Sequence, residues 1–245
     1  MKNSSLKLLV ILILLFCVIS LKLTAQWEPC NNGMYQGHVN AIGIRGNNII
    51  AGTGFGIFLS TNLGDNWTAK NSGLTNQNVN TITIDGNNLF VGTNDGIFLS
   101  TDLGDNWTAK NSGLTNQYIN TIAIDGTNLF VGTNDGIFLS TDLGNSWIEK
   151  DSGLNAKNVY SITISGNNIF AGTGGGGIFL STDMGNSWIP KNSGLGNTMS
   201  FGVKSILVAG NNIFIGITGW ETGIFLSTDN GNSWTVKNTG LTMLN

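Results

Sequence analysis

The octapeptide Ser100–Trp107, STDLGDNW, decides the fold because close copies of it recur along the chain. The other copies read STNLGDNW, STDLGNSW, STDMGNSW and STDNGNSW. The five copies end at Trp67, Trp107, Trp147, Trp188 and Trp234, which are 40, 40, 41 and 46 residues apart. Trp27 stands another 40 residues before Trp67 and extends the register. A unit repeated at this period predicts a repeat architecture.

One repeat reads as four short strands. Ile82 and Ile84 alternate with threonines, which is the pattern of a strand with one buried face. Residues 89–91 and 97–99 form a second and a third apolar strand, the octapeptide is the next turn, and residues 107–110 form a fourth strand. Four short antiparallel strands per repeat predict an all-β fold, a β-propeller of four-stranded antiparallel blades. Five blades is the first expectation, and a piece of a larger ring is the alternative.

The octapeptide residues have structural roles in this interpretation. The Asp102 carboxylate can accept backbone N–H bonds and close the turn, Gly104 can take a conformation that a β-carbon would strain, and Trp107 can lie between adjacent blades. Asn62 replaces the aspartate in the first copy and keeps an acceptor oxygen without the charge. The structural set is Ser60, Asn62, Gly64, Trp67, Ser100, Asp102, Gly104, Trp107, Ser140, Asp142, Gly144, Trp147, Ser181, Asp183, Gly185, Trp188, Ser227, Asp229, Gly231 and Trp234.

The pattern Ser-x-Asp-x-Gly-x-x-Trp resembles the Asp-box, or BNR, motif of sialidases, sortilin-type receptors, certain xyloglucan hydrolases and propellers related to the photosystem II assembly factor. The resemblance covers residues 27–245. It implies that each box joins the third and fourth strands of a blade, on the face away from any active site. The motif is specific for the fold and says little about function.

The first residues predict export. Twelve apolar residues, Leu8–Ile19, follow Lys2 and Lys7, and the run leads to the small residue Ala25. This pattern is typical of a signal peptide over residues 1–25, with residues 26–245 as the mature propeller. The alternative is retention as a membrane anchor, but the run is shorter than the roughly 20 residues that span a bilayer. We expect a secreted, periplasmic or cell-surface protein with no membrane span after cleavage.

Charge and cysteine content exclude several classes of site. Without residues 1–25, eight basic residues face 14 acidic ones, a net charge of −6, which does not favour a nucleic-acid partner. Cys30 is the single cysteine left and His38 the only histidine, so we expect an inert thiol, no internal disulfide, no metal and no cofactor.

Two groups of residues are candidates for ligand binding. Insertions in the fifth copy contain Phe201, Trp220 and Glu221, in loops expected on one face of the propeller. A second group occupies the first two polar positions of the first strand in each blade and includes His38, Tyr118, Tyr160 and Lys204, together with Asn40, Asn78, Asn80, Asn120 and Asn158. The alternatives are that Trp220 covers the end of the propeller and that the second group is only rim polarity.

The sequence does not favour catalysis. Sialidase chemistry needs three arginines, and Arg45 is the only one. Other glycosidases need two carboxyl groups about 5–9.5 Å apart, and the candidates on the expected face are Asp95, Asp135 and Glu221. We therefore expect a non-catalytic binding module or scaffold for a protein or glycan. The alternative is a multivalent lectin with one site per blade, and a glycoside hydrolase is less favoured.

Overall fold

The computed structural model describes residues 29–34, 37–196, 202–218 and 223–241. The chain divides into two compact units, Met1–Cys30 and Asn31–Asn245, and all the strands belong to the second. The described residues contain strands and turns and no helix. None of the described residues forms a helix long and apolar enough to cross a membrane.

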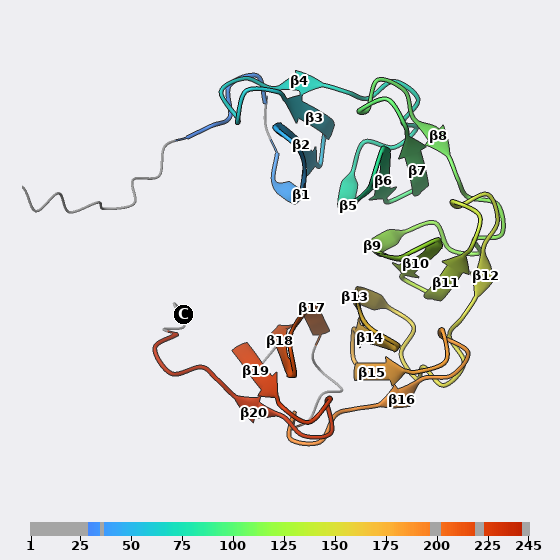
Figure 1. Ribbon diagram of the computed structural model, residues 1–245, viewed down its shortest axis with the longest axis vertical. Coiled ribbons are helices and arrows are strands. Elements are labelled where there is room, and N and C mark those ends of the chain that lie inside the picture. The colour runs from blue at the N-terminus through green and yellow to red at the C-terminus, as the bar shows by residue number, and fades with distance from the viewer. Residues whose placement is uncertain (1–28, 35–36, 197–201, 219–222, 242–245) are drawn as a thin grey trace, which may run out of the picture. The chain divides into compact units, whose positions relative to one another are not determined.

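Twenty strands form five antiparallel sheets, each with its four strands in sequence order, and the fold is a β-propeller of five blades (Figure 1). Blade 1 contains β1 (Val39–Arg45), β2 (Asn48–Thr53), β3 (Gly56–Ser60) and β4 (Thr68–Ala69); blade 2 contains β5 (Val79–Asp85), β6 (Asn88–Thr93), β7 (Gly96–Ser100) and β8 (Thr108–Ala109). Blade 3 contains β9 (Ile119–Asp125), β10 (Asn128–Thr133), β11 (Gly136–Ser140) and β12 (Ile148–Glu149). Blade 4 contains β13 (Val159–Ser165), β14 (Asn168–Thr173), β15 (Gly177–Ser181) and β16 (Ile189–Pro190); blade 5 contains β17 (Gly202–Ala209), β18 (Asn212–Thr218), β19 (Gly223–Ser227) and β20 (Thr235–Val236).

The expected strands of each repeat are confirmed, although the fourth strand is shorter than residues 107–110 suggested. In blade 2 it pairs with β7 only through Ala109 and Thr108. The fourth strand of blade 5, β20, comes from the C-terminal part of the chain, so the described residues close this sheet without an N-terminal segment. Trp27, the extra copy of the motif's end, lies outside the described residues.

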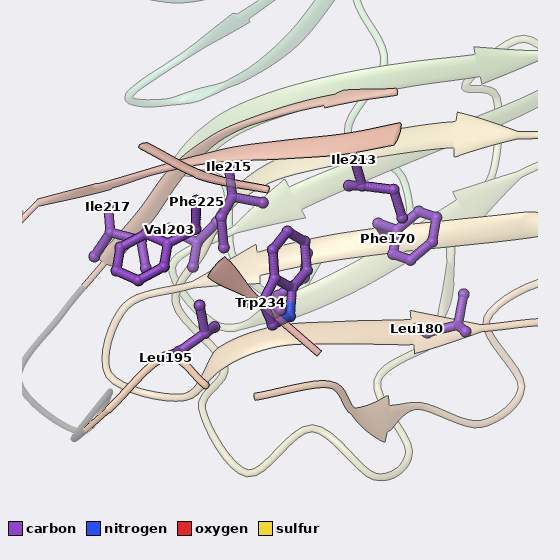
Figure 2. Packing of buried hydrophobic residues seen from close by; sticks show 10 residues of the cluster. Phe170, Leu180, Leu195, Val203, Ile213, Ile215, Ile217, Phe225 and Trp234 are labelled. Atoms are coloured by element: carbon purple, nitrogen blue, oxygen red, sulfur yellow. The ribbon is translucent and has the colours of Figure 1, made fainter. Parts of the chain in front are cut away.

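The hydrophobic core lies between consecutive blades and is repeated at each junction. At the last junction, Phe170 and Leu180 of blade 4 meet Ile213, Phe225 and Trp234 of blade 5 (Figure 2). Equivalent clusters join blades 1 and 2, blades 2 and 3, and blades 3 and 4. Trp107, Trp147, Trp188 and Trp234 therefore each pack between two blades, as the sequence predicted, whereas Trp67 packs within blade 1 and against Met34.

Candidate functional site

Each Asp box forms a closed network of hydrogen bonds in the turn between the third and fourth strands. In blade 2 the Ser100 hydroxyl donates to Asp102 Oδ1 at 2.7 Å and accepts from the Gly104 N–H at 2.9 Å. Asp102 accepts from the Asn106 N–H and from Asn106 Nδ2, each at 2.9 Å. The same serine, aspartate and glycine contacts recur in blades 3, 4 and 5. The boxes therefore stabilise turns, and their side chains are committed to one another.

The structure corrects one detail of the expected turn. The nearest buried N–H, that of Gly104, bonds to the serine hydroxyl, and the carboxylate instead accepts from the residue four positions on. The residue before the glycine also has positive φ, 59° at Leu103, where a branched side chain is rare. Sequence reasoning assigned the unusual conformation to the glycine alone, because leucine gives no signal for it.

Hydrogen bonding lowers the pKa of the box carboxyl groups. The Asn106 side chain, then its N–H and the Ser100 hydroxyl, lower the pKa of Asp102 from 3.8 to about 2. The pKa values of Asp142, Asp183 and Asp229 fall to about 2 for the same kind of reason, with the serine four positions on as the largest cause. These groups stay ionised at neutral pH and are acceptors in the turn, which does not suit a proton donor in catalysis.

Asn62 in the first box keeps part of this network, as the sequence predicted. Its Oδ1 accepts from the Ser60 hydroxyl at 2.9 Å and from the Asn66 N–H at 3.0 Å. It has no second carboxylate oxygen for the Asn66 side chain, which instead accepts from Asn32 Nδ2 at 2.6 Å. The first box is thus a neutral version of the same turn.

The boxes lie at the end of each blade opposite the turns between the second and third strands, because the third strand runs from one end to the other. The first strand of each blade is the innermost in Figure 1 and begins at the end away from the boxes. The candidates at the beginning of the first strand therefore share that end. We call it the rim end, defined by residues 38–40 and their equivalents in the other blades.

Three rim asparagines connect consecutive blades. Asn40 Nδ2 donates to the Val79 carbonyl at 2.9 Å, Asn80 Nδ2 to the Ile119 carbonyl at 3.0 Å, and Asn120 Nδ2 to the Val159 carbonyl at 3.0 Å. The sequence placed these residues correctly on the rim but treated them as ligand candidates. Their amides instead hold the inner strands together, so they are less available to a ligand.

The pattern changes at blades 4 and 5, where Tyr160 and Lys204 take the place of the asparagine. Lys204 Nζ lies 3.0 Å from the centroid of the Tyr160 ring, and Asn158 Nδ2 lies 3.1 Å from the tyrosine hydroxyl. Asn158 also lies 3.4 Å from Asn120 Nδ2, which donates to Asn134 at 2.9 Å. A chain of polar contacts thus runs from blade 3 to an exposed ammonium on blade 5. We call Asn158, Tyr160 and Lys204 the rim corner.

Two other described candidates lie away from the rim corner. His38 and Tyr118 are exposed at the beginning of β1 and β9, on other blades. Phe201, Trp220 and Glu221 lie outside the described residues. Sequence reasoning thus included all three residues of the corner in one aligned group, but spacing did not reveal that they contact one another.

Acidic groups near the rim end are partly neutralised. Lys157 Nζ lies 2.8 Å from Asp151 Oδ2 and 3.5 Å from Glu149 Oε1. The hydrogen bond and the charge of Asp151 raise the pKa of Lys157. Asp95 and Asp135 are exposed turn residues whose N–H groups donate to Thr93 and Thr133. Among the described residues, no group of three histidine, cysteine or acidic residues could hold a metal ion.

A hollow at the box end is a feature that sequence reasoning missed. It has a volume of about 380 Å³ and is lined by Ser165, Asn168, Phe170, Asn211, Asp229, Asn230 and neighbouring residues of blades 4 and 5. Asn230 occupies the position of Leu103, whose side chain packs against the core between blades 1 and 2. The sequence sign of this hollow is the copy STDNGNSW, in which asparagine replaces the leucine or methionine of the other copies.

The chain is similar to solved propellers of several kinds. No family model and no curated protein matches it. An ancestral GH74 enzyme is 22% identical over 88% of this chain and 33% of its own, with a TM-score of 0.72. The extracellular domain of BT4673 from B. thetaiotaomicron is 16% identical over 81% of this chain and 27% of its own, with a TM-score of 0.68. YCF48 bound to D1 peptide is 15% identical over 82% of this chain and 66% of its own, with a TM-score of 0.62.

These similarities show the fold, a propeller of the same type as in these Asp-box proteins. The chain spans about a quarter to a third of the length of the first two structures. The solved relatives include an extracellular domain, enzymes and a peptide complex, so the fold alone does not select one activity.

Proposed function

We propose that the chain is an exported, non-catalytic binding module that recognises a protein ligand at the rim corner. The observation that supports the proposal is the break in the rim pattern. Blades 1 to 3 use asparagine amides to join the inner strands, whereas Tyr160 and Lys204 present an aromatic ring and an exposed cation at the same position. Tyrosine is among the usual anchors of a protein interface, and a cation beside it can select the charge of a partner.

Two further facts support a site at this corner. The insertions of the fifth copy contain Phe201, Trp220 and Glu221, and the described strand ends beside them, at Gly202, Thr218 and Gly223, belong to the rim end of blade 5. YCF48, a propeller similar to this chain, was solved bound to a peptide. We propose Trp220 as a second aromatic anchor and Glu221 and Phe201 as further contacts of the same ligand. His38 and Tyr118 would then lie outside the contact.

A multivalent lectin is the second candidate. It is favoured by the identity of residues 88–104 with residues 128–144, which gives blades 2 and 3 the same rim turns. Equal sites on equal blades predict several ligands per chain and strong dependence on multivalent display. A glycoside hydrolase, suggested by the GH74 structures, would need two of Asp95, Asp135 and Glu221 placed as an acid and base pair.

A binding screen followed by titration tests the proposal. Purified chain is screened against a random-peptide display library and a glycan array, and each binder is titrated by calorimetry. We expect a peptide binder with one site per chain and a loss of about 1–4 kcal/mol in Tyr160→Ala, Lys204→Ala and Trp220→Ala, as for interface anchors. His38→Ala is the matched rim control and should bind as the wild type does.

The other outcomes identify the other functions. Close to one glycan site per blade, with most sites retained in Trp220→Ala, would replace the proposal with the lectin. Release of reducing ends from xyloglucan, lost in Glu221→Gln, would establish a hydrolase and contradict the non-catalytic assignment.

A further inference from the structure

At each internal junction, one face of a blade packs on the opposite face of the next blade. We call the face that packs on the preceding blade the leading face, and the face that packs on the following blade the trailing face. At the last junction the trailing face of blade 4 supplies Phe170 and Leu180, and the leading face of blade 5 supplies Val203 and Ile213 (Figure 2). Four such junctions are present, so the chain shows repeatedly which surfaces fit each other.

A valine or isoleucine fits against a glycine at each junction. A β-carbon at Gly92 would lie 2.5 Å from Ile119 Cγ2, and a β-carbon at Gly132 would lie 2.6 Å from Val159 Cγ1. Gly52 and Gly172 make the same close approach to Val79 and Val203. Glycine is required because any side chain would occupy the place of the next blade's residue. We call the valine or isoleucine the knob and the glycine the hole.

The leading face of blade 1 has a knob without a hole. Val39 aligns with the four knobs, which are buried, but it is exposed. Ile42 on the same face is 63% exposed, whereas Ile122 and Ile162 at the equivalent positions are each 7% exposed. Ile44 is exposed as well. The described residues leave this inner, apolar part of the leading face uncovered.

The trailing face of blade 5 has a hole without a knob. No atom of another blade lies within 4 Å of the β-carbon position at Gly216, although a β-carbon there would lie 2.5 Å from the Ser205 hydroxyl oxygen of the same blade, which would have to rotate away. Leu207 is 62% exposed, and Ile224 is 39% exposed where Ile97, Ile137 and Ile178 are fully buried. Gly240 is open as well, with nothing within 4 Å of its β-carbon position. Its counterparts Gly73, Gly113, Gly153 and Gly194 lie against the backbone of the next blade's tryptophan, but in blade 1 Gly33 already takes that place on Trp67.

We propose that the trailing face of blade 5 in one copy of the chain docks on the leading face of blade 1 in a second copy. Val39 would enter the space at Gly216, and Ile42 and Ile44 would cover Leu207 and Ile224. A second copy is the occupant because it carries a leading face, and leading faces fit the equivalent trailing faces at four junctions of the same chain. Exposed apolar surface of this kind commonly marks an interface.

The contact is head-to-tail, because each copy uses a different face on each side. Such contacts close into a ring when the rotation between copies allows it and otherwise continue into longer assemblies. At the outer edge of blade 1, the Asn32 carbonyl already accepts from the Trp67 N–H at 2.9 Å. The turn at residues 238–241 of the neighbouring copy must therefore move aside, and the docking uses mainly the inner strands.

The experiment uses two variants that block opposite faces. Gly216→Val fills the hole, and Ile42→Glu places a charge on the apolar part of the leading face. The mass of the chain of residues 26–245 is measured by light scattering after size exclusion over a range of concentrations. We expect the wild type to form dimers or larger assemblies and each variant alone to have the mass of a single chain.

Mixing the variants tests the direction of the contact. The Ile42→Glu chain keeps a functional trailing face and the Gly216→Val chain keeps a functional leading face, so their mixture should form a 1:1 complex. Ile189→Glu, an equally exposed isoleucine on the outer strand β16, is the matched control and should associate as the wild type does. Far-UV circular dichroism and thermal melting check that each variant is folded.

Every other result overturns the proposal. A wild type that is a single chain at all concentrations would show that the faces stay free or close on each other within one chain. Association that persists in Gly216→Val but not in Ile42→Glu would indicate contact between two leading faces. Two monomeric variants that do not combine would exclude the head-to-tail contact.

Discussion

Blades 1 and 3 have nearly the same strand pattern, yet their first strands lie in different environments. Ile42 and Ile122 occupy equivalent positions, and the first is 63% exposed while the second is 7% exposed. The difference arises because blade 3 has a blade on each side and the leading face of blade 1 has none among the described residues. In a repeat protein, burial is a property of the junction, and the sequence of one repeat does not determine it.

The largest expected effect is the loss of a side chain at a complete junction. Ile122→Ala should lower the free energy of unfolding by about 2–5 kcal/mol, as for other buried isoleucines. Ile42→Ala should change it by less than about 0.5 kcal/mol, as at an exposed site. Urea unfolding, carried out in the Gly216→Val background to keep the chain monomeric, measures both. Equal losses would show that blade 1 is covered and that the comparison is wrong.

The trailing face of blade 1 packs on blade 2, so substitutions there should destabilise the chain as much as at an internal blade. Asn40 donates to the Val79 carbonyl as Asn120 donates to the Val159 carbonyl. Asn40→Ala should therefore cost about 0.5–1.5 kcal/mol, the usual net value of one hydrogen bond. Asn120→Ala should cost at least as much because the amide also reaches Asn134. Denaturant unfolding of both variants, with His38→Ala as the control, checks the values; no loss at Asn40 would contradict the bridging role.

The sequence predicted the fold well because its signals are local. The box residues, the alternation at Ile82 and Ile84 and the glycine turns all act within a few residues, so the four strands of each blade followed from them. The candidate site was predicted only in part. Tyr160 and Lys204 are far apart in the sequence, and their contact depends on how blade 4 packs on blade 5. The bridging use of Asn80 could not be foreseen, because its acceptor is a carbonyl on the next blade.

The boxes give a smaller effect that appears only in acid. The pKa of Asp102 is about 2 in the folded chain and 3.8 without its hydrogen bonds, so its contribution is present above about pH 4 and is lost as the pH falls through 2. Asn62 has no such group. Asn62→Asp should therefore raise the melting temperature at pH 6 and raise it much less near pH 2. Asp102→Asn is the reciprocal control, and a shift of Asn62→Asp that is equal at both pH values would refute the carboxylate's role.

The smallest expected effect separates backbone strain from packing at one position of the box. Leu63 and Leu103 have φ values of 60° and 59°, a region in which asparagine is better tolerated than leucine. Leu63 is exposed, whereas Leu103 packs against the core between blades 1 and 2. Leu63→Asn should therefore stabilise the chain by a few tenths of a kcal/mol, roughly the part of the strain that asparagine relieves. Leu103→Asn should be destabilising, because the lost packing exceeds that gain. Asn230 has φ 59° in the fifth box, which indicates that the turn accepts asparagine without rearrangement. Melting curves of the two variants therefore test whether packing on the preceding blade, and not the turn itself, makes leucine favourable at this position. Stabilisation by both substitutions would show that the packing at Leu103 contributes nothing.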